Sequence, residues 1–425
     1  MKQVTIAIIG AGIRGMEAYA PYALKHPDEV KFVAVAEPDP QRREKFRKTF
    51  NINDEMCFES WEDLLAKHKM ADAVLICTQD KMHFAPSMSA MAKGYHVLLE
   101  KPMATDPVEC MKMGEKAEKL GRVFLVCHVL RYTPFFMTLK SLLAQGVIGQ
   151  LVSIQHNENV GYWHQAHSFV RGQYRDSAAS SPMILAKSCH DMDILLWLAG
   201  RNCVRLSSFG SLTYFKSENA PEGAPERCLD GCPNSAICHY YAPSLYLTED
   251  TGWPTCAISN SMAMEDRIEA LKKGPYGKCV YHCDNNVVDH QVVNMEFEDE
   301  ITATFTMCAF TRDVSRTLKL MGTEGEIRGA MEKNEIEIIP FNGNEKRVIS
   351  LKEAKSGHGG GDEAIVREFI RLVQNVGDSQ SQGGDGCTSA TESTQGTLMA
   401  FAAEEARLTH KVITMKEYIK QKLNT

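Results

Sequence analysis

The chain has 425 residues, of which 44% are hydrophobic and 24% charged, a balance typical of a globular protein with two or three domains. Its formal net charge of -7 argues against a nucleic acid or an anionic membrane surface as the partner. No stretch approaches the roughly 18 apolar residues that a membrane-spanning helix needs. The start, MKQVTIAIIGAG, is interrupted by glycines and does not fit a signal peptide, so we expect a cytoplasmic protein.

Short apolar strands alternate with helical segments over the first 125 residues. The predicted strands are 4–9, 30–36, 73–77, 96–99 and 123–127. The predicted helices are 13–24, 41–49, 61–67, 84–93 and 106–120. Strands at this spacing predict an α/β domain, with a parallel sheet covered by helices on both faces, and we place it at residues 1–128.

The pattern changes in the rest of the chain, residues 129–425. From residue 151 onward apolar and polar residues alternate, as in LVSIQHNENV, which predicts a large, open, mostly antiparallel sheet with one wet face. Helices in this α+β domain are expected at 131–145, 186–198, 362–374 and 391–409. The remaining segments are an irregular cysteine-rich insert at about 217–285 and an exposed loop at 376–390.

A glycine-rich turn follows the first strand. Gly10, Gly12 and Gly15 form the pattern G-x-G-x-x-G, with Ile13 and Arg14 between the last two glycines. The first glycine allows a tight turn, the second lets the backbone approach a pyrophosphate, and the third lets the helix pack on the strand. This pattern between a strand and a helix predicts a dinucleotide cofactor.

The end of the second strand indicates which dinucleotide is bound. Glu37 stands there, and a carboxylate at this place accepts hydrogen bonds from a ribose 2′-hydroxyl and repels a 2′-phosphate. Arg42 and Arg43 follow, and they either reach a 2′-phosphate or are solvated helix residues. We expect NAD rather than NADP.

Two residues could handle a substrate proton. Lys101 lies in Glu100-Lys101-Pro102 after the fourth strand, at the sheet edge where ligands bind, and can donate a hydrogen bond to a substrate hydroxyl. His190 opens a predicted helix, and histidine is well suited to accept an alcohol proton near neutral pH. The alternatives are a surface turn for the tripeptide and a structural hydrogen bond for the histidine.

The glycine turn, Glu100-Lys101-Pro102 and His190-Asp191-x-Asp193 together resemble the Gfo/Idh/MocA oxidoreductase family over nearly the whole chain. The resemblance implies an N-terminal Rossmann domain, a C-terminal sheet that covers the nicotinamide, and sugars or inositols as substrates. It implies that Lys101 and His190 are catalytic and that the protein is a homodimer or homotetramer. It also implies further residues near the cofactor and in the segment after the fifth strand, namely Thr78, His83, Glu100, His128 and Arg131.

One position departs from the family pattern. Many members carry an aspartate four residues before the histidine, where this chain has Ala186 followed by Lys187. The carboxylate partner implied for the proton relay is therefore missing. Lys187 either supplies a cation in its place or points to solvent.

Residues 161–171 combine aromatic and polar side chains. Aromatic rings offer a flat face to sugar C–H groups, while histidine, glutamine and arginine bond hydroxyls. We expect a loop that lines the substrate pocket, with subunit contacts as the alternative. Asp289 and Gln291 are expected on one face of another strand, opposite His290, and residues 358–362 near the same pocket. The residues predicted to bind substrate are Arg131, Tyr162, Trp163, His164, His167, Lys187 and Asp191.

The chain has 14 cysteines, most of them scattered and expected to be buried free thiols. Cys228, Cys232 and Cys238 are instead spaced C-x3-C-x5-C in the insert, and Cys279 follows after 40 residues, with Cys283 close behind. Thiolates at such spacing suit a structural tetrahedral zinc. An iron–sulfur cluster, disulfides or free thiols are the alternatives.

The sequence thus predicts an NAD-dependent oxidoreductase that transfers hydride to or from a secondary alcohol of a sugar or glycoside. A second hypothesis is a glycosidase with tightly bound NAD, in which transient oxidation of the sugar permits elimination of the aglycone. A third hypothesis is a non-catalytic NAD-binding sensor, which the missing aspartate at position 186 keeps open.

Overall fold

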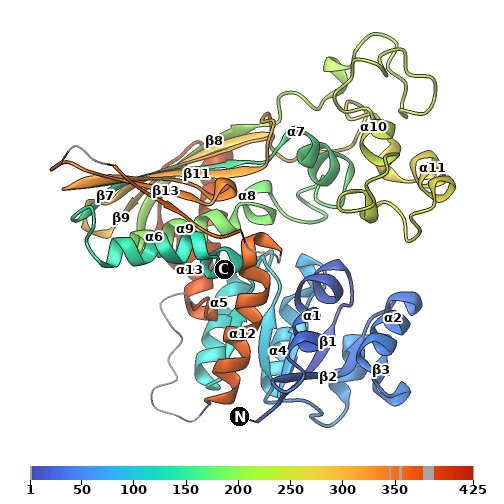
Figure 1. Ribbon diagram of the computed structural model, residues 1–425, viewed down its shortest axis with the longest axis horizontal. Helices are drawn as coiled ribbons and strands as arrows, with labels where there is room; N and C mark the ends of the chain where they lie inside the picture. Colours follow the sequence, from blue (N-terminus) through green and yellow to red (C-terminus); the bar gives the residue numbers. More distant parts are fainter. Residues whose placement is uncertain (1, 344–345, 354–356, 377–386, 425) are drawn as a thin grey trace.

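The computed structural model describes residues 2–343, 346–353, 357–376 and 387–424, and it has one sheet in each half (Figure 1). The N-terminal sheet has six strands in the order β3-β2-β1-β4-β5-β6, and every neighbouring pair is parallel. This arrangement confirms the predicted Rossmann-type sheet. The strands are β1 (Val4–Ile9), β2 (Val30–Ala36), β3 (Cys57–Phe58), β4 (Ala73–Ile76), β5 (His96–Leu99) and β6 (Phe124–Val126).

Helices cover this sheet close to where the sequence predicts them. They are α1 (Pro21–Lys25), α2 (Pro40–Phe50), α3 (Trp61–Ala66), α4 (Phe84–Ala92) and α5 (Pro107–Lys119). The segment after the glycine turn differs from the single helix predicted over 13–24. It is a π-helical turn, η1 (Arg14–Tyr19), followed by α1, because Pro21 has no N–H to continue the hydrogen-bond ladder.

The second sheet has nine strands in the order β14-β13-β12-β11-β7-β10-β9-β8-β15. Only the β7–β10 pair is parallel, so the predicted mostly antiparallel sheet is confirmed. Its strands are β7 (Leu151–Asn159), β8 (Cys203–Ser211), β9 (His290–Phe297), β10 (Thr302–Cys308), β11 (Ser315–Gly322), β12 (Gly325–Ala330), β13 (Glu335–Pro340), β14 (Arg347–Ser350) and β15 (Ile413–Thr414).

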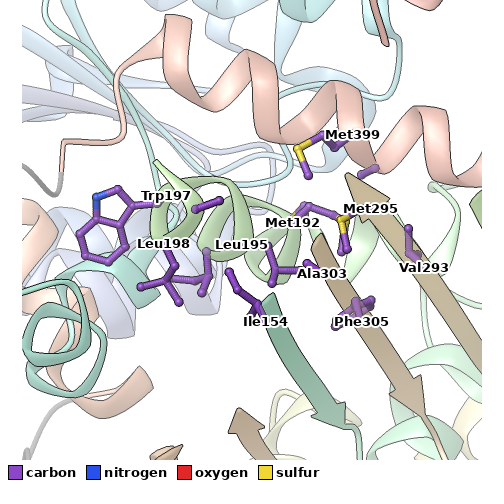
Figure 2. Packing of buried hydrophobic residues seen from close by; sticks show 14 of the residues in the cluster. Ile154, Met192, Leu195, Trp197, Leu198, Val293, Met295, Ala303, Phe305 and Met399 are labelled. Carbon is purple, nitrogen blue, oxygen red and sulfur yellow. The ribbon is translucent and has the colours of Figure 1, made fainter. Parts of the chain in front are cut away.

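One face of the large sheet is covered by helices. Figure 2 shows Met192 and Leu195 of one helix against Ile154, Ala303 and Phe305 of the strands beneath it. The alternating side chains of β7 and β10 thus bury their inward positions in one large hydrophobic core. The helices concerned are α6 (Pro134–Ala144), α8 (Met183–Ala186), α9 (Cys189–Ala199), α13 (Ala390–Thr409) and α14 (Met415–Leu423).

The end of the chain returns to the first domain. Helix α12 (Gly361–Gln374) buries Ile365 and Phe369 in the core that also holds Val4 and Ile6 of β1. The N-terminal core is therefore completed by residues more than 350 positions along the chain. The expected loop at 376–390 lies mostly at residues 377–386, outside the described residues.

Two segments beside the sheet matter for the site. Residues 161–171, expected to be a loop, are helical: α7 (Tyr162–His164) runs into the π-helical η5 (Gln165–Arg171). The insert carries the short helices α10 (Ala242–Tyr246) and α11 (Met264–Lys273) and projects beside α7 (Figure 1). In the part of the chain that is described, no helix has the length and apolar character needed to cross a bilayer.

Candidate active site

The glycine turn has room for a phosphate group at one position only. Gly10 has φ +90°, and a Cβ there would lie 2.6 Å from the carbonyl oxygen of Cys77. A Cβ on Gly15 would lie 2.5 Å from the carbonyl oxygen of Gly10. At Gly12 the nearest atom is the tip of Arg42, 4.0 Å away, so this backbone is open to a ligand. The three glycines therefore fit the roles that a dinucleotide pyrophosphate requires.

Glu37 supports this turn from the end of β2. Its buried carboxylate accepts hydrogen bonds from the backbone N–H of Ala11 at 2.7 Å and of Asp39 at 3.1 Å. Arg43 is occupied elsewhere, since it bonds the backbone oxygen of Glu37 and pairs with Glu59. These contacts favour a structural role for Arg43 over recognition of a 2′-phosphate. Arg42 stays on the open side of the turn.

Arg14 and Glu100, both predicted near the cofactor, lie in a buried polar network. Arg14 Nε is 2.6 Å from Glu100 Oε1, and its Nη2 is 2.8 Å from Asp362 Oδ1 of α12. The Tyr19 hydroxyl also donates to Glu100, at 2.8 Å. Burial alone would raise the pKa of Glu100, but the charges of Arg14 and Lys101 lower it. The network fixes the glycine turn to the end of β5, while the Ile13 side chain stays 45% exposed beside it.

His83 joins two loops at the same edge of the sheet. Its Nδ1 lies 2.7 Å from the carbonyl oxygen of Pro102, and its Nε2 lies 3.1 Å from that of Thr78. The ring is completely buried. His83 and Thr78 are therefore placed to hold the loop after β4 against the turn that carries Lys101.

Lys101 and His190 lie in one site. Burial would lower the pKa of Lys101, but neighbours that include Glu100 and Asp80 raise it, which keeps the ammonium protonated. His190 is 5% exposed, and burial followed by the charge of Lys101 lowers its pKa well below the usual value. Its Nδ1 is buried without a hydrogen-bond partner among the described residues. A cationic donor thus stands close to a neutral imidazole, as proton transfer from an alcohol requires.

Two further histidines surround His190. The ring of His128 is 5.7 Å away, centroid to centroid and edge-on, and the ring of His358 is 6.2 Å away. Both ring nitrogens of His128 are buried without partners in the described part of the chain. His358 also contacts Asp362, which connects the predicted segment 358–362 to this site and to Arg14.

Around position 186, where many family members carry an aspartate, Lys101 contacts a backbone carbonyl group and Lys187 pairs with a charged residue of the sheet. Lys101 Nζ donates to the carbonyl oxygen of Ala186 at 2.8 Å. The side chain of Lys187 is only 16% exposed and does not point to solvent, since its Nζ lies 3.1 Å from Glu158 Oε1. Arg316 Nη2 approaches the other oxygen of Glu158 at 2.6 Å. Both contacts are close ion pairs without the alignment of good hydrogen bonds.

Sequence reasoning missed Glu158 and Arg316. Both lie at inward positions of their strands, where Ile154 and Leu318 stand at the apolar equivalents. The sequence signal that could have revealed them is a charged residue at an inward strand position, because a buried charge needs a partner. β7 and β11 pair these two residues directly opposite each other.

Asp191 and Arg131 are both buried, and each forms ion pairs with other residues of the chain. Asp191 is fully buried, and its Oδ1 receives Arg316 Nε at 2.9 Å and His156 Nε2 at 2.8 Å. Arg131 is 1% exposed and makes two 2.7 Å bonds to Asp193 on α9. These placements favour structural roles over the direct substrate contacts predicted for them.

The aromatic segment divides into two parts. His167 is 3% exposed, bonds the hydroxyl of Tyr246 at 2.9 Å and stacks on Tyr276 at 4.8 Å, so it anchors the insert. Tyr162 likewise contacts Tyr240. Trp163 stacks on His164 at 5.7 Å, and burial and the charges of groups that include Lys187, Arg316 and Lys101 lower the pKa of His164.

The four cysteines predicted to bind zinc line one small cavity of the insert, but the metal prediction is not supported. In the described chain no three or more histidine, cysteine or acidic side chains are placed to hold a metal ion. All the cysteines are free thiols. Arg171 lines the same cavity, with Nη2 3.6 Å from Cys228 Sγ, so its side chain takes up part of the space among the thiols. Burial raises the pKa of Cys238 and Cys279, which favours neutral thiols over the thiolates that bind zinc.

Comparisons with known proteins support the family and the fold. Among relatives, "Putative oxidoreductase YteT" of Bacillus subtilis (strain 168) is 23% identical over 364 residues, covering 80% of this chain and 82% of that protein. "2,7-anhydro-N-acetylneuraminate hydratase" of Mediterraneibacter gnavus (strain ATCC 29149 / DSM 114966 / JCM 6515 / VPI C7-9) is 26% identical over 200 residues, 47% of this chain and 50% of that protein. Its match therefore spans about half of each chain.

A solved structure has the same fold. The crystal structure of scyllo-inositol dehydrogenase from Lactobacillus casei with bound NAD(H) and scyllo-inositol superposes with a TM-score of 0.66 at 19% identity, covering 98% of this chain and 100% of that one. Two family models match the sequence. They are described as "Oxidoreductase family, NAD-binding Rossmann fold", over residues 4–128, and "Oxidoreductase family, C-terminal alpha/beta domain", over residues 140–391. The chain therefore belongs to the Gfo/Idh/MocA family of oxidoreductases, with an NAD-binding N-terminal domain.

Proposed function

We propose that this protein is an NAD-dependent dehydrogenase acting on a secondary alcohol of a sugar or glycoside. The observation that carries the proposal is the pair formed by protonated Lys101 and neutral His190 beside the carboxyl edge of the Rossmann sheet. The inositol dehydrogenase with the same fold supports a polyhydroxylated substrate. Bound NAD supplies a hydride acceptor for such a reaction.

Lys101 and His190 have different roles in the proposed proton transfer. Lys101 donates a hydrogen bond to the substrate hydroxyl and stabilises the oxygen as negative charge develops on it. His190 accepts the hydroxyl proton, and since its Nδ1 is enclosed we assign this step to Nε2. Ala186, through its carbonyl oxygen, orients the ammonium of Lys101.

The test is NADH formation with a panel of free sugars, inositols and glycosides. We expect Lys101→Met and His190→Asn to lower kcat/KM by at least about 100-fold while NADH binding persists. Lys112→Met on the exposed face of α5 is the matched control and should keep wild-type rates. Wild-type rates in either site variant would refute the assignment.

A second candidate is a reaction in which the NAD is reduced and reoxidised within one cycle, as in the glycosidase hypothesis. The similarity to a protein named as a hydratase favours it, since a hydratase carries out no net oxidation. Aglycone release from an aryl glycoside without net NADH would distinguish this function. Stoichiometric NADH would exclude it for that substrate.

We also propose a homodimer or homotetramer formed through the uncovered face of the large sheet. An apolar side chain on β8 supports this, since Phe209 alternates with the buried Ser208 and is 62% exposed. Light scattering of the purified protein tests it, and a monomer at micromolar concentration would refute it.

A further inference from the structure

Trp253 of the insert has no role in the site as described above. Its ring lies edge-on to His164 at a centroid distance of 4.9 Å and an angle of 85°. It also lies 5.4 Å from Trp163 and 5.4 Å from His167. Yet 45% of the residue is exposed. Three rings hold the indole in place and leave a large part of its surface to solvent.

The position of this indole relates it to the reacting groups. His164, against which Trp253 packs, feels the charges of Lys187, Arg316 and Lys101, so it stands beside the site.

The chemistry of an indole in this position points to a carbohydrate. The exposed part of the indole offers apolar surface to a ligand, and a sugar ring has a C–H surface of similar size. An immobilised ring loses little conformational entropy on binding, which makes it a suitable anchor for a ligand.

The contact with His164 indicates which part of the ligand Trp253 meets. The indole packs against His164, whose pKa is lowered by burial and by the charges of Lys187 and Lys101 among others. Trp253 therefore adjoins the site through His164 rather than through the reacting groups themselves. A second ring, linked to the one that reacts, would reach it.

We propose that Trp253 is a stacking platform for a second sugar unit or an aromatic aglycone, so that the substrate is a disaccharide or glycoside rather than a free sugar or inositol. This inference rests on the proposed dehydrogenase or redox-cycling function of the same site. It makes Trp253 a specificity-determining residue that touches the ligand away from the reacting carbon. The insert thereby acquires a role in substrate selection.

The experiment compares Trp253→Ala and Trp253→Phe with the wild type on a glycoside and on its matching free sugar. We expect Trp253→Ala to lower kcat/KM for the glycoside about tenfold through KM, with the free sugar changed less than about twofold. Trp253→Phe should retain most of the glycoside activity, because a flat face remains. Ile237→Ala, at a 76% exposed position of the same insert, is the matched control and should change neither.

A binding measurement that needs no turnover distinguishes a failure of the platform proposal from a failure of the proposed enzymatic function. Saturation-transfer NMR with NAD-loaded protein and a neutral disaccharide reports contact with the ligand even if no sugar is oxidised. Disaccharide binding that is lost in Trp253→Ala but kept in Lys101→Met supports the platform, whatever the turnover assay shows. Equal losses on glycoside and free sugar, no change on either, or no difference in disaccharide binding would overturn it.

Discussion

The ion pair between Arg131 and Asp193 permits a quantitative test of whether Arg131 is structural. Both side chains are 1% exposed, and two bonds of 2.7 Å join them. Arg131→Met keeps most of the side-chain volume but leaves the carboxylate of Asp193 buried without its cation. Breaking a buried pair in this way costs about 3–5 kcal/mol.

The second partner of Arg131 supplies a graded control. Glu392 lies 2.6 Å from Arg131 Nη1, but its side chain is 56% exposed and therefore well screened by solvent. We expect Glu392→Gln to cost only about 0–1 kcal/mol. Asp193→Leu combined with Arg131→Met removes both buried charges and should recover most of the loss.

Urea unfolding followed by circular dichroism measures these differences, using the midpoint of the first transition because the chain has two sheets. The expected order of stability is wild type, then Glu392→Gln, then the double variant, with Arg131→Met the least stable. The reasoning is refuted if Arg131→Met unfolds at the wild-type urea concentration while KM for the sugar rises. That result would return Arg131 to the substrate-binding role that the sequence predicts.

Three further predictions concern the cofactor turn, the buried histidines and the thiols. Gly12→Ala should fold normally yet bind NADH more weakly in a fluorescence titration, whereas Gly10→Ala and Gly15→Ala should also lower the melting temperature, since only their Cβ atoms clash with backbone. Burial lowers the pKa of His96 and of His167 to about 4, so below pH 6.5 the unfolded chain binds protons that the folded chain does not. Stability should therefore fall as the pH drops from 6.5 towards 4, and an unfolding midpoint unchanged between pH 7 and pH 5 would contradict this. Protein purified without added metal should contain far less than one zinc per chain by mass spectrometry, and stoichiometric zinc would show that the thiols of the insert do hold a metal.

The elements that the sequence predicts well are those defined by local patterns. The parallel strands are short, apolar and bounded by turns, so their pattern is complete within ten residues. β3 has only Cys57 and Phe58, too few residues for any periodicity, and it was missed. The helical state of residues 161–171 was missed for a different reason. Their stacking partners, such as Tyr240, Tyr246 and Tyr276, lie some 70–110 positions further along the chain, so tertiary contacts decide the structure.

The same distinction separates the predicted from the missed parts of the site. The glycine turn and Glu37 have fixed spacing, and their geometry is as expected of that spacing. The pair of Glu158 with Arg316 depends on strand register between residues 158 positions apart, which no local pattern contains. The zinc prediction is not supported, and spacing alone does not reveal that Arg171 lines the same cavity as the thiols.

The absence of a carboxylate at position 186 also limits what Lys101 can do. Its ammonium donates to the carbonyl oxygen of Ala186, and an amide oxygen orients a cation but does not take up a proton near neutral pH. The carboxylate beside Lys187, Glu158, has one oxygen paired with Lys187 and the other with Arg316, so both of its oxygens already face cations. In the proposed reaction, proton acceptance therefore falls to His190, because burial and the charge of Lys101 lower its pKa and favour the neutral imidazole. Under this proposal the alanine redistributes the roles within the site, with Lys101 as the electrostatic donor and His190 as the base, rather than removing the chemistry.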